Sequence, residues 1–142
     1  MRRVRFTIAA AALSISLSAC GDDITTPSST ASGTPTEYFS GTIWPGGETS
    51  YAFTVNQDGL ITETLGSVTA AGAGRAAEDA TLTIGFGVPH GTGCGRSQSV
   101  DTKAGLMPQL GTTAPAGIYC ADVSAPANAP GPFDFVLRIV HP

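Results

Sequence analysis

Residues 133–140 read Phe-Asp-Phe-Val-Leu-Arg-Ile-Val, and this stretch decides the fold of the chain. Its large apolar side chains, Phe133, Phe135, Leu137 and Ile139, stand at every second position, so an extended chain carries all of them on one face. An amphipathic helix would instead space them three and four residues apart. The stretch therefore predicts a β-strand with one face in a hydrophobic core.

The same period of two recurs at shorter intervals through the chain from Glu37 to Pro142. Glycine and proline separate these stretches, and no segment has a convincing helical period. We therefore expect an all-β protein, an antiparallel, jelly-roll-like β-sandwich of about seven or eight strands. The expected strands, besides the last, cover residues 38–43, 49–55, 60–65, 81–86 and 117–123.

The connections between these strands carry their own signals. Asp58-Gly59 predicts a tight hairpin, because glycine supplies the positive φ that such a turn needs. Residues 68–77 are predicted to form a loop, since Gly72 and Gly74 interrupt them. A weaker strand is expected at residues 106–110, at a sheet edge, because Pro108 cannot donate a hydrogen bond to a neighbouring strand.

Residues 85–95 are rich in glycine, but no lysine follows the last glycine and no helix is expected behind it, as a phosphate-binding loop would require. We interpret them as a flexible connection that carries His90 at the surface and Cys94. In residues 117–123 either face could be the buried one. If Cys120 is bonded to Cys94, Tyr119 and Val123 are the buried pair.

Arg2, Arg3 and Arg5 lie near the start of the chain, a short apolar run follows, and it ends at Leu17-Ser18-Ala19-Cys20. The run of about 12 residues is too short to span a bilayer, which takes roughly 20. The stretch resembles the lipobox of bacterial lipoproteins, which implies that residues 1–19 are a signal peptide and that Cys20 becomes the lipidated first residue, carrying palmitate or a related chain. The alternative is an ordinary secretory signal with an incidental cysteine.

Residues 20–36 follow as a Ser/Thr/Pro/Gly-rich stretch, which predicts a flexible linker between the lipidated N-terminus and a single domain at 37–142. Removal of the leader takes away three of seven basic residues and leaves four against eleven acidic ones, a net charge near −7. Without a basic cluster, nucleic-acid binding is not expected. Attachment to the membrane would come from the lipid, with the outer membrane favoured because no acidic residue directly follows Cys20.

Cys94 and Cys120 remain as a pair, and in an oxidising compartment we expect them to form a structural disulfide. Closing a loop of roughly 27 residues would stabilise the fold by about 3 to 4 kcal/mol in the chain-entropy model. The alternative, a reactive thiol, lacks a Cys-x-x-Cys spacing and a neighbouring base.

Several of the expected strands together resemble the bacterial pre-peptidase C-terminal domain group. The resemblance covers Glu37 to Pro142, and it implies a jelly-roll sandwich that serves as an accessory or binding module without catalysis of its own. Residues 1–36 are not expected to form a peptidase, so a role in assisting an attached enzyme is not expected. The stretches that carry it are residues 38–43, 51–55 with Asp58-Gly59, 79–84, 116–121 and 133–142.

No catalytic motif emerges, so we expect no enzyme. The nearest approach to a nucleophile elbow, residues 95–99, ends in serine instead of glycine. His90 and His141 stand apart from carboxylates at ligand spacing, so zinc is not expected. No other cofactor is expected either, apart from Ca²⁺, for which Glu78, Asp79 and Asp101 are the first candidates because their loops are the longest.

Trp44, the single tryptophan, lies in a Trp-Pro-Gly-Gly turn between the first two strands. We expect it to close one end of the core, and the alternative is an exposed contact for a sugar or a protein. The sequence thus predicts a non-catalytic, lipid-anchored protein of the cell envelope that binds an envelope protein or a polysaccharide. The alternatives are a structural subunit without a ligand site, a calcium-binding surface domain, and an enzyme with an unrecognised site.

Overall fold

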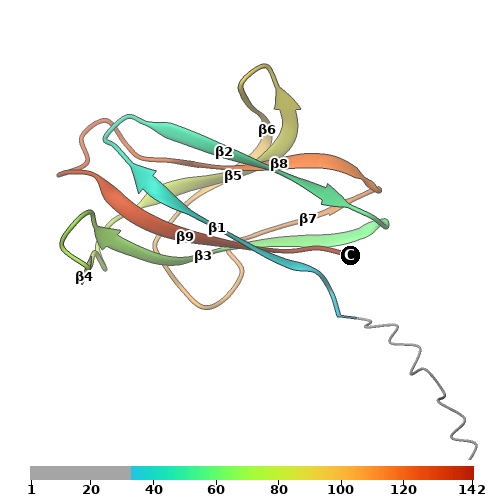
Figure 1. The fold of residues 1–142 in the computed structure, drawn as a ribbon, viewed down its shortest axis with the longest axis horizontal. Coiled ribbons are helices and arrows are strands. Elements are labelled where there is room, and N and C mark those ends of the chain that lie inside the picture. Colours follow the sequence, from blue (N-terminus) through green and yellow to red (C-terminus); the bar gives the residue numbers. More distant parts are fainter. Residues whose placement is uncertain (1–32) are drawn as a thin grey trace, which may run out of the picture. The chain divides into compact units, whose positions relative to one another are not determined.

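The computed structural model describes residues 33–142, which form nine β-strands and no helix (Figure 1). In this range no helix has the length and apolar character needed to cross a bilayer. The predicted signal peptide, Cys20 and most of the predicted linker lie outside the described residues. The strands are β1 Thr36–Ile43, β2 Glu48–Val55, β3 Gly59–Ala70, β4 Arg75–Ala76, β5 Leu82–His90, β6 Gly93–Thr102, β7 Leu110–Ala114, β8 Gly117–Ser124 and β9 Phe133–Val140.

Two antiparallel sheets are packed face to face. In the first sheet the order is β1-β9-β3, and both β7 and the short β4 pair with the other side of β3. The second sheet has the order β2-β8-β5-β6. With β4 set aside, each sheet has the four-strand order of a jelly roll, and the predicted fold class is confirmed.

Strand β9 has the predicted bounds and the predicted alternation. Its four apolar side chains are buried, while the residues between them are only half-buried on the other face of the sheet. β9 pairs with β1 along its whole length and with β3 on its other side. The buried face of β9 therefore lies at the centre of the core. Its other members come from both sheets and the loop after β8: Ile43, Phe53, Val55, Ile61, Leu65, Val68, Leu82, Ile84, Phe86, Ala114, Ala121, Val123 and Ala125.

Strand β3 is longer than predicted, because the alternation of its side chains changes partway along. Leu65 pairs with Leu137, but the next residue to pair with β9 is Ser67, so Gly66 is an extra residue in a β-bulge. Beyond the bulge Val68 points into the core. The prediction of a loop over residues 68–77 was wrong for Val68–Ala70 and for β4, since the bulge hides the period of two.

The predicted hairpin at Asp58-Gly59 was also wrong. β2 and β3 belong to different sheets, so residues 56–58 turn a corner between the sheets, and Gly59 does not have a positive φ. The Asp58 carboxylate accepts a hydrogen bond of 2.8 Å from the backbone N–H of Ala116, in the neighbouring corner. The Asp58 carboxylate thus stabilises the corner by linking it to the neighbouring one.

Residues 85–95 form most of a long hairpin, β5–β6, that turns at Gly91, which has a φ of 59°. The prediction of a flexible connection was wrong, because five glycines in this segment conceal the alternation of apolar side chains. The prediction of a weak edge strand at residues 106–110 was wrong as well, since β7 begins only at Leu110. In β8 the face with Tyr119, Ala121 and Val123 points to the core, as expected for a bonded Cys120. The fully buried pair is Ala121 and Val123, whereas Tyr119, expected to be buried, is only half-buried.

One ionisable side chain lies inside the core. Glu63 lies between Ile61 and Leu65 on the inward face of β3 and is 1% exposed, and within residues 33–142 neither of its carboxyl oxygens has a hydrogen-bond partner. Burial raises the pKa of Glu63 from 4.5 to about 8, and the negative charge of Asp122 adds to the rise. At neutral pH Glu63 is therefore the uncharged acid.

This carboxyl makes the stability of the domain depend on pH. In the unfolded chain Glu63 loses its proton near 4.5, whereas the folded domain keeps it until about pH 8. Between these values the unfolded state binds fewer protons, so the free energy of unfolding falls as pH rises, by at most about 1.4 kcal/mol per pH unit. We expect Glu63→Gln to remove this slope in urea unfolding followed across the same pH range, and the exposed-site control Glu78→Gln to retain it. An unchanged slope in Glu63→Gln would contradict the assignment.

Candidate functional site

Three connecting segments meet at one end of the sandwich, which we call the loop end: the β1–β2 turn 44–47, the segment 71–81 around β4, and the β8–β9 loop 125–132. Backbone hydrogen bonds join them. Gly46 N–H donates to the carbonyl of Ala125 at 3.1 Å, and Ala71 N–H donates to that of Pro132 at 3.1 Å. The chain enters the sandwich at the opposite end, where Thr36 of β1 pairs with Val140 near the C-terminus (Figure 1).

Trp44 is 66% exposed, so the prediction that it closes the core was wrong and the alternative, an exposed aromatic at a turn, is what the structure has. Its turn is held firmly. Gly47 N–H donates to the Trp44 carbonyl at 2.8 Å, and Ala125 N–H donates to the Gly47 carbonyl at 3.0 Å. Gly46 has a φ of 72°, which favours glycine. The indole is thus presented to solvent on a fixed backbone.

A groove of about 750 Å³ lies beside this turn, between the segment around β4 and the β8–β9 loop. Its base includes the core residue Phe133, and its walls are built of small and polar residues. Asp79 on one wall forms an ion pair of 3.1 Å with Lys103. The wall residues are Arg75, Ala76, Ala77, Glu78, Asp79, Ala80, Thr81, Pro126, Asn128, Ala129 and Pro130.

The three candidate calcium ligands are not gathered into one group. Glu78 and Asp79 line the groove, but Asp101 lies on β6, where it accepts a hydrogen bond of 2.6 Å from the Thr83 hydroxyl. Within residues 33–142 no three His, Cys, Asp or Glu side chains converge as metal ligands would. Calcium binding stays a prediction without a geometric site to support it.

The two histidines differ in burial and in their neighbours. His90 is exposed, as expected, but it ends β5 instead of lying in a loop. His141 is 2% exposed, and its Nε2 lies 2.9 Å from Glu37 Oε1, so the tertiary structure gives it a carboxylate neighbour 104 residues away in sequence. This contact ties the C-terminus to the start of β1, far from the loop end.

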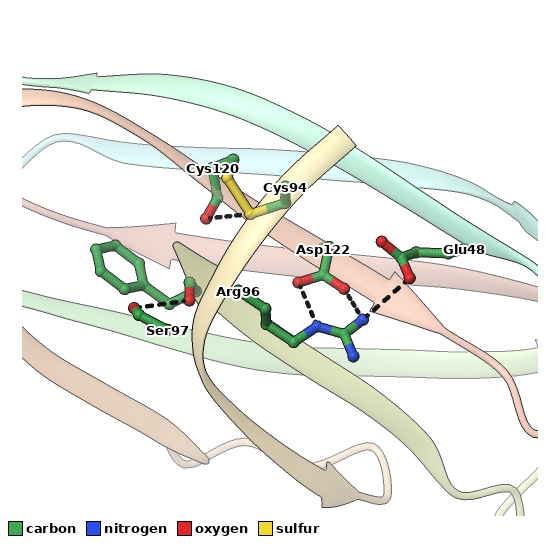
Figure 2. The surroundings of a disulfide bond; sticks show 7 residues. Glu48, Cys94, Arg96, Ser97, Cys120 and Asp122 are labelled. Atoms are coloured by element: carbon green, nitrogen blue, oxygen red, sulfur yellow. Dashed lines mark hydrogen bonds and ion pairs between the residues drawn. A yellow bond between two sulfur atoms is a disulfide. The ribbon is translucent and has the colours of Figure 1, made fainter. Parts of the chain in front are cut away.

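Cys94 and Cys120 form the predicted disulfide, with an S–S distance of 2.02 Å and a Cα–Cα distance of 5.7 Å (Figure 2). Cys120 points away from the core. The start of β6 crosses over β8 to reach it, which Figure 2 shows, and a side chain at Gly87 would collide with the β6 backbone at Gly95. The bond is typical of proteins in oxidising compartments, so the structure supports an extracytoplasmic location.

Beside the disulfide lies an ion pair that sequence reasoning missed. Asp122 is fully buried although it points away from the core, and the Arg96 guanidinium covers it, with Nε 3.0 Å from Oδ1 and a second contact from Arg96 to Oδ2 (Figure 2). Arg96 also lies 3.4 Å from Glu48. Its hydrogen bond to Asp122 raises the pKa of the Arg96 guanidinium. Arg96 lies two residues after Cys94, and Asp122 two residues after Cys120. Because residues two apart in a strand share a face, the disulfide indicates that Arg96 and Asp122 face each other.

Comparisons with protein-family models and with curated proteins give no match. Among solved structures the chain is similar to a mitogen derived from Yersinia pseudotuberculosis, with 15% identity over 77% of this chain and 87% of that chain and a TM-score of 0.51. It also matches PliG, a periplasmic inhibitor of g-type lysozyme from Salmonella Typhimurium, with 17% identity over 77% and 88% of the two chains and a TM-score of 0.46. The similarity to the mitogen supports the fold: this is an all-β sandwich.

The disulfide should contribute measurably to stability, because it closes a loop between residues 26 apart. We expect the double variant Cys94→Ala/Cys120→Ala to lose about 3 kcal/mol of unfolding free energy in urea. Dithiothreitol should shift the wild-type Tm in the same direction and leave the double variant unchanged. Equal stability of wild type and double variant would show that the bond does not hold the hairpin in place.

Proposed function

We propose that this protein is a lipid-anchored, extracytoplasmic binding module of the cell envelope, without catalytic activity of its own, that presents its loop end to a partner protein. The observation that carries the proposal is the arrangement of the two ends of the sandwich. The chain enters at Thr36, and the exposed Trp44 and the groove lie at the far end of β1. A domain tethered through residues preceding Thr36 would turn its loop end away from the membrane.

The chemistry of the loop end supports protein binding. Tryptophan is enriched among residues that dominate binding energy in protein interfaces, because it buries a large area at a low cost in side-chain entropy. Trp44 is already exposed on a turn fixed by hydrogen bonds, so binding would order little backbone. The groove at the same end, one of whose lining residues, Pro126, accepts a hydrogen bond of 3.2 Å from Gly46 N–H of the Trp44 turn, offers room for a side chain of the partner.

The anchor part of the proposal rests on the lipobox resemblance at Leu17 to Cys20, and the accessory role agrees with the resemblance to pre-peptidase C-terminal domains. The net charge near −7 after loss of the leader leaves little attraction to anionic lipid, so a lipid at Cys20 would supply the attachment. The outer membrane is the proposed site.

Trp44→Ala tests the binding surface. We expect partner affinity to fall by about tenfold or more, because an exposed aromatic anchor is lost, while the unfolding free energy stays within about 0.5 kcal/mol. The measurement is crosslinking and capture of partners by the tagged full chain in its own cells, followed by titration of the captured protein. Ile118→Ala, at an equally exposed position on β8, is the control. A partner that is captured equally by both variants would place binding elsewhere.

Cys20→Ser tests the anchor separately. If Cys20 carries the lipid, the variant should move from the membrane fraction to the soluble extracytoplasmic fraction, since the acyl chains supply the membrane affinity. Fractionation with detection of the tagged chain measures this, and metabolic labelling with a palmitate analogue should mark the wild type alone. Unchanged partitioning would show that Cys20 is not the anchor.

A further inference from the structure

A shallow hollow of about 340 Å³ lies on the outer face of the first sheet, lined by residues other than those of the groove, and it adjoins the loop end, where Gly72 N–H reaches Asp134. Two rows of side chains cross the sheet there in register. In one row Ser40 pairs with Val136 and Val136 with Ser67; in the next, Thr42 pairs with Asp134 and Asp134 with Thr69. Four hydroxyl groups thus surround one carboxylate. We call this set the hydroxyl hollow.

The β-bulge in β3 creates one side of this hollow. Without the extra residue Gly66, the alternation that buries Ile61 and Leu65 would also point Ser67 and Thr69 into the core and Val68 outward. The bulge reverses the alternation, so both hydroxyls reach the outer face. Bulges commonly occur where a strand must aim side chains at a binding or active site.

Asp134 is held in place but keeps capacity to accept further hydrogen bonds. The Thr42 hydroxyl donates to its Oδ1 at 2.6 Å, and Gly72 N–H reaches its Oδ2 at 3.4 Å. A carboxylate has about four acceptor sites, so about two remain open toward the hollow. Within residues 33–142 the hydroxyls of Ser40, Ser67 and Thr69 make no side-chain hydrogen bond, which leaves each free to donate and accept.

An exposed aromatic ring lies on the same face of the sheet, one position beyond the hollow along β1. Tyr38 is 67% exposed on β1, two residues before Ser40 and therefore next to it on the same face. Tyr38 pairs with Arg138 of β9, whose guanidinium is turned aside to bond the Thr64 hydroxyl at 3.2 Å and the Leu106 carbonyl at 3.5 Å. The Tyr38 ring and the Asp134 carboxylate thus lie on the same face of the sheet, four residues or about 13 Å apart along the strands, with Ser40 between them.

We propose that the hydroxyl hollow is a binding site for a neutral saccharide. A sugar ring has an apolar face that can stack on Tyr38 and neighbouring hydroxyls that both donate and accept. Because Tyr38 lies about 13 Å from Asp134 along the strands, the O–H groups of another ring of the same oligosaccharide would donate to Asp134 and exchange hydrogen bonds with Ser67 and Thr69. The uncompensated charge of Asp134 disfavours acidic sugars, which commits the site to uncharged ones. This surface uses other side chains than Trp44 and the groove, but it adjoins the loop end at Gly72, so a bound glycan would lie next to the partner protein.

The experiment is a titration of the isotope-labelled chain, released from the membrane by Cys20→Ser, with cellotetraose, maltotetraose and chitotetraose. We expect saturable NMR shifts with at least one of them, with a Kd on the order of 1 mM or tighter, at the amides of Ser40, Thr42, Ser67 and Thr69. Asp134→Asn and Tyr38→Ala should each weaken binding by about tenfold. Thr69→Val, a smaller change, keeps the test informative if Asp134→Asn does not fold.

The chain offers a matched control on the second sheet. Thr83 and Asp101 form a cross-strand pair with the same 2.6 Å hydrogen bond as Thr42 and Asp134, but they line no hollow with Ser67 or Thr69. Asp101→Asn should therefore bind the saccharide like the wild type. Absence of saturable shifts with all three sugars would overturn the proposal, as would shifts that map to another surface or an equal loss of affinity in Asp101→Asn.

Discussion

The strict alternation of apolar side chains along β9 is the constraint on which the rest of the structure depends. β9 lies between β1 and β3, so its buried face fixes which residues of both neighbours point inward. A slip of one residue in either pairing would exchange the core and solvent faces of the neighbouring strand. In β3 the apolar residues shift from odd to even positions after Leu65. The extra residue Gly66 forms a bulge, so Val68 still points into the core.

In the second sheet, a disulfide and an ion pair outside the core position the edge strand β6. Cys120 and Asp122 point away from the core on β8 and would face solvent in a flat sheet. The start of β6 folds over them, so a disulfide joins one and Arg96 covers the other (Figure 2). A covalent bond and a charge-assisted hydrogen bond, two residues apart, thereby hold an edge strand against the outer face of its own sheet.

The molecule presents two surfaces to which we assign binding, and they adjoin where Gly72 N–H reaches Asp134. The loop end presents Trp44 on a turn fixed to the β8–β9 loop, and the outer face of the first sheet presents Asp134 among hydroxyl groups. Neither surface uses the ionisable group in the core, Glu63, whose burial between apolar neighbours governs stability. The proposed binding surfaces and the pH response therefore involve different residues of the fold.

The sequence by itself determined the fold class and the strands in which polar and apolar residues alternate cleanly, such as β9, because that period of two is a local property of the chain. It also indicated the Cys94–Cys120 bond, since only two cysteines remained to pair. The tertiary structure alone decided that Asp58-Gly59 turns between sheets, that Trp44 is exposed, and that Glu63 and His141 are buried. Each of these features depends on contacts with residues distant in sequence. The same holds for the hydroxyl hollow, because the register of β1, β9 and β3 brings its side chains together.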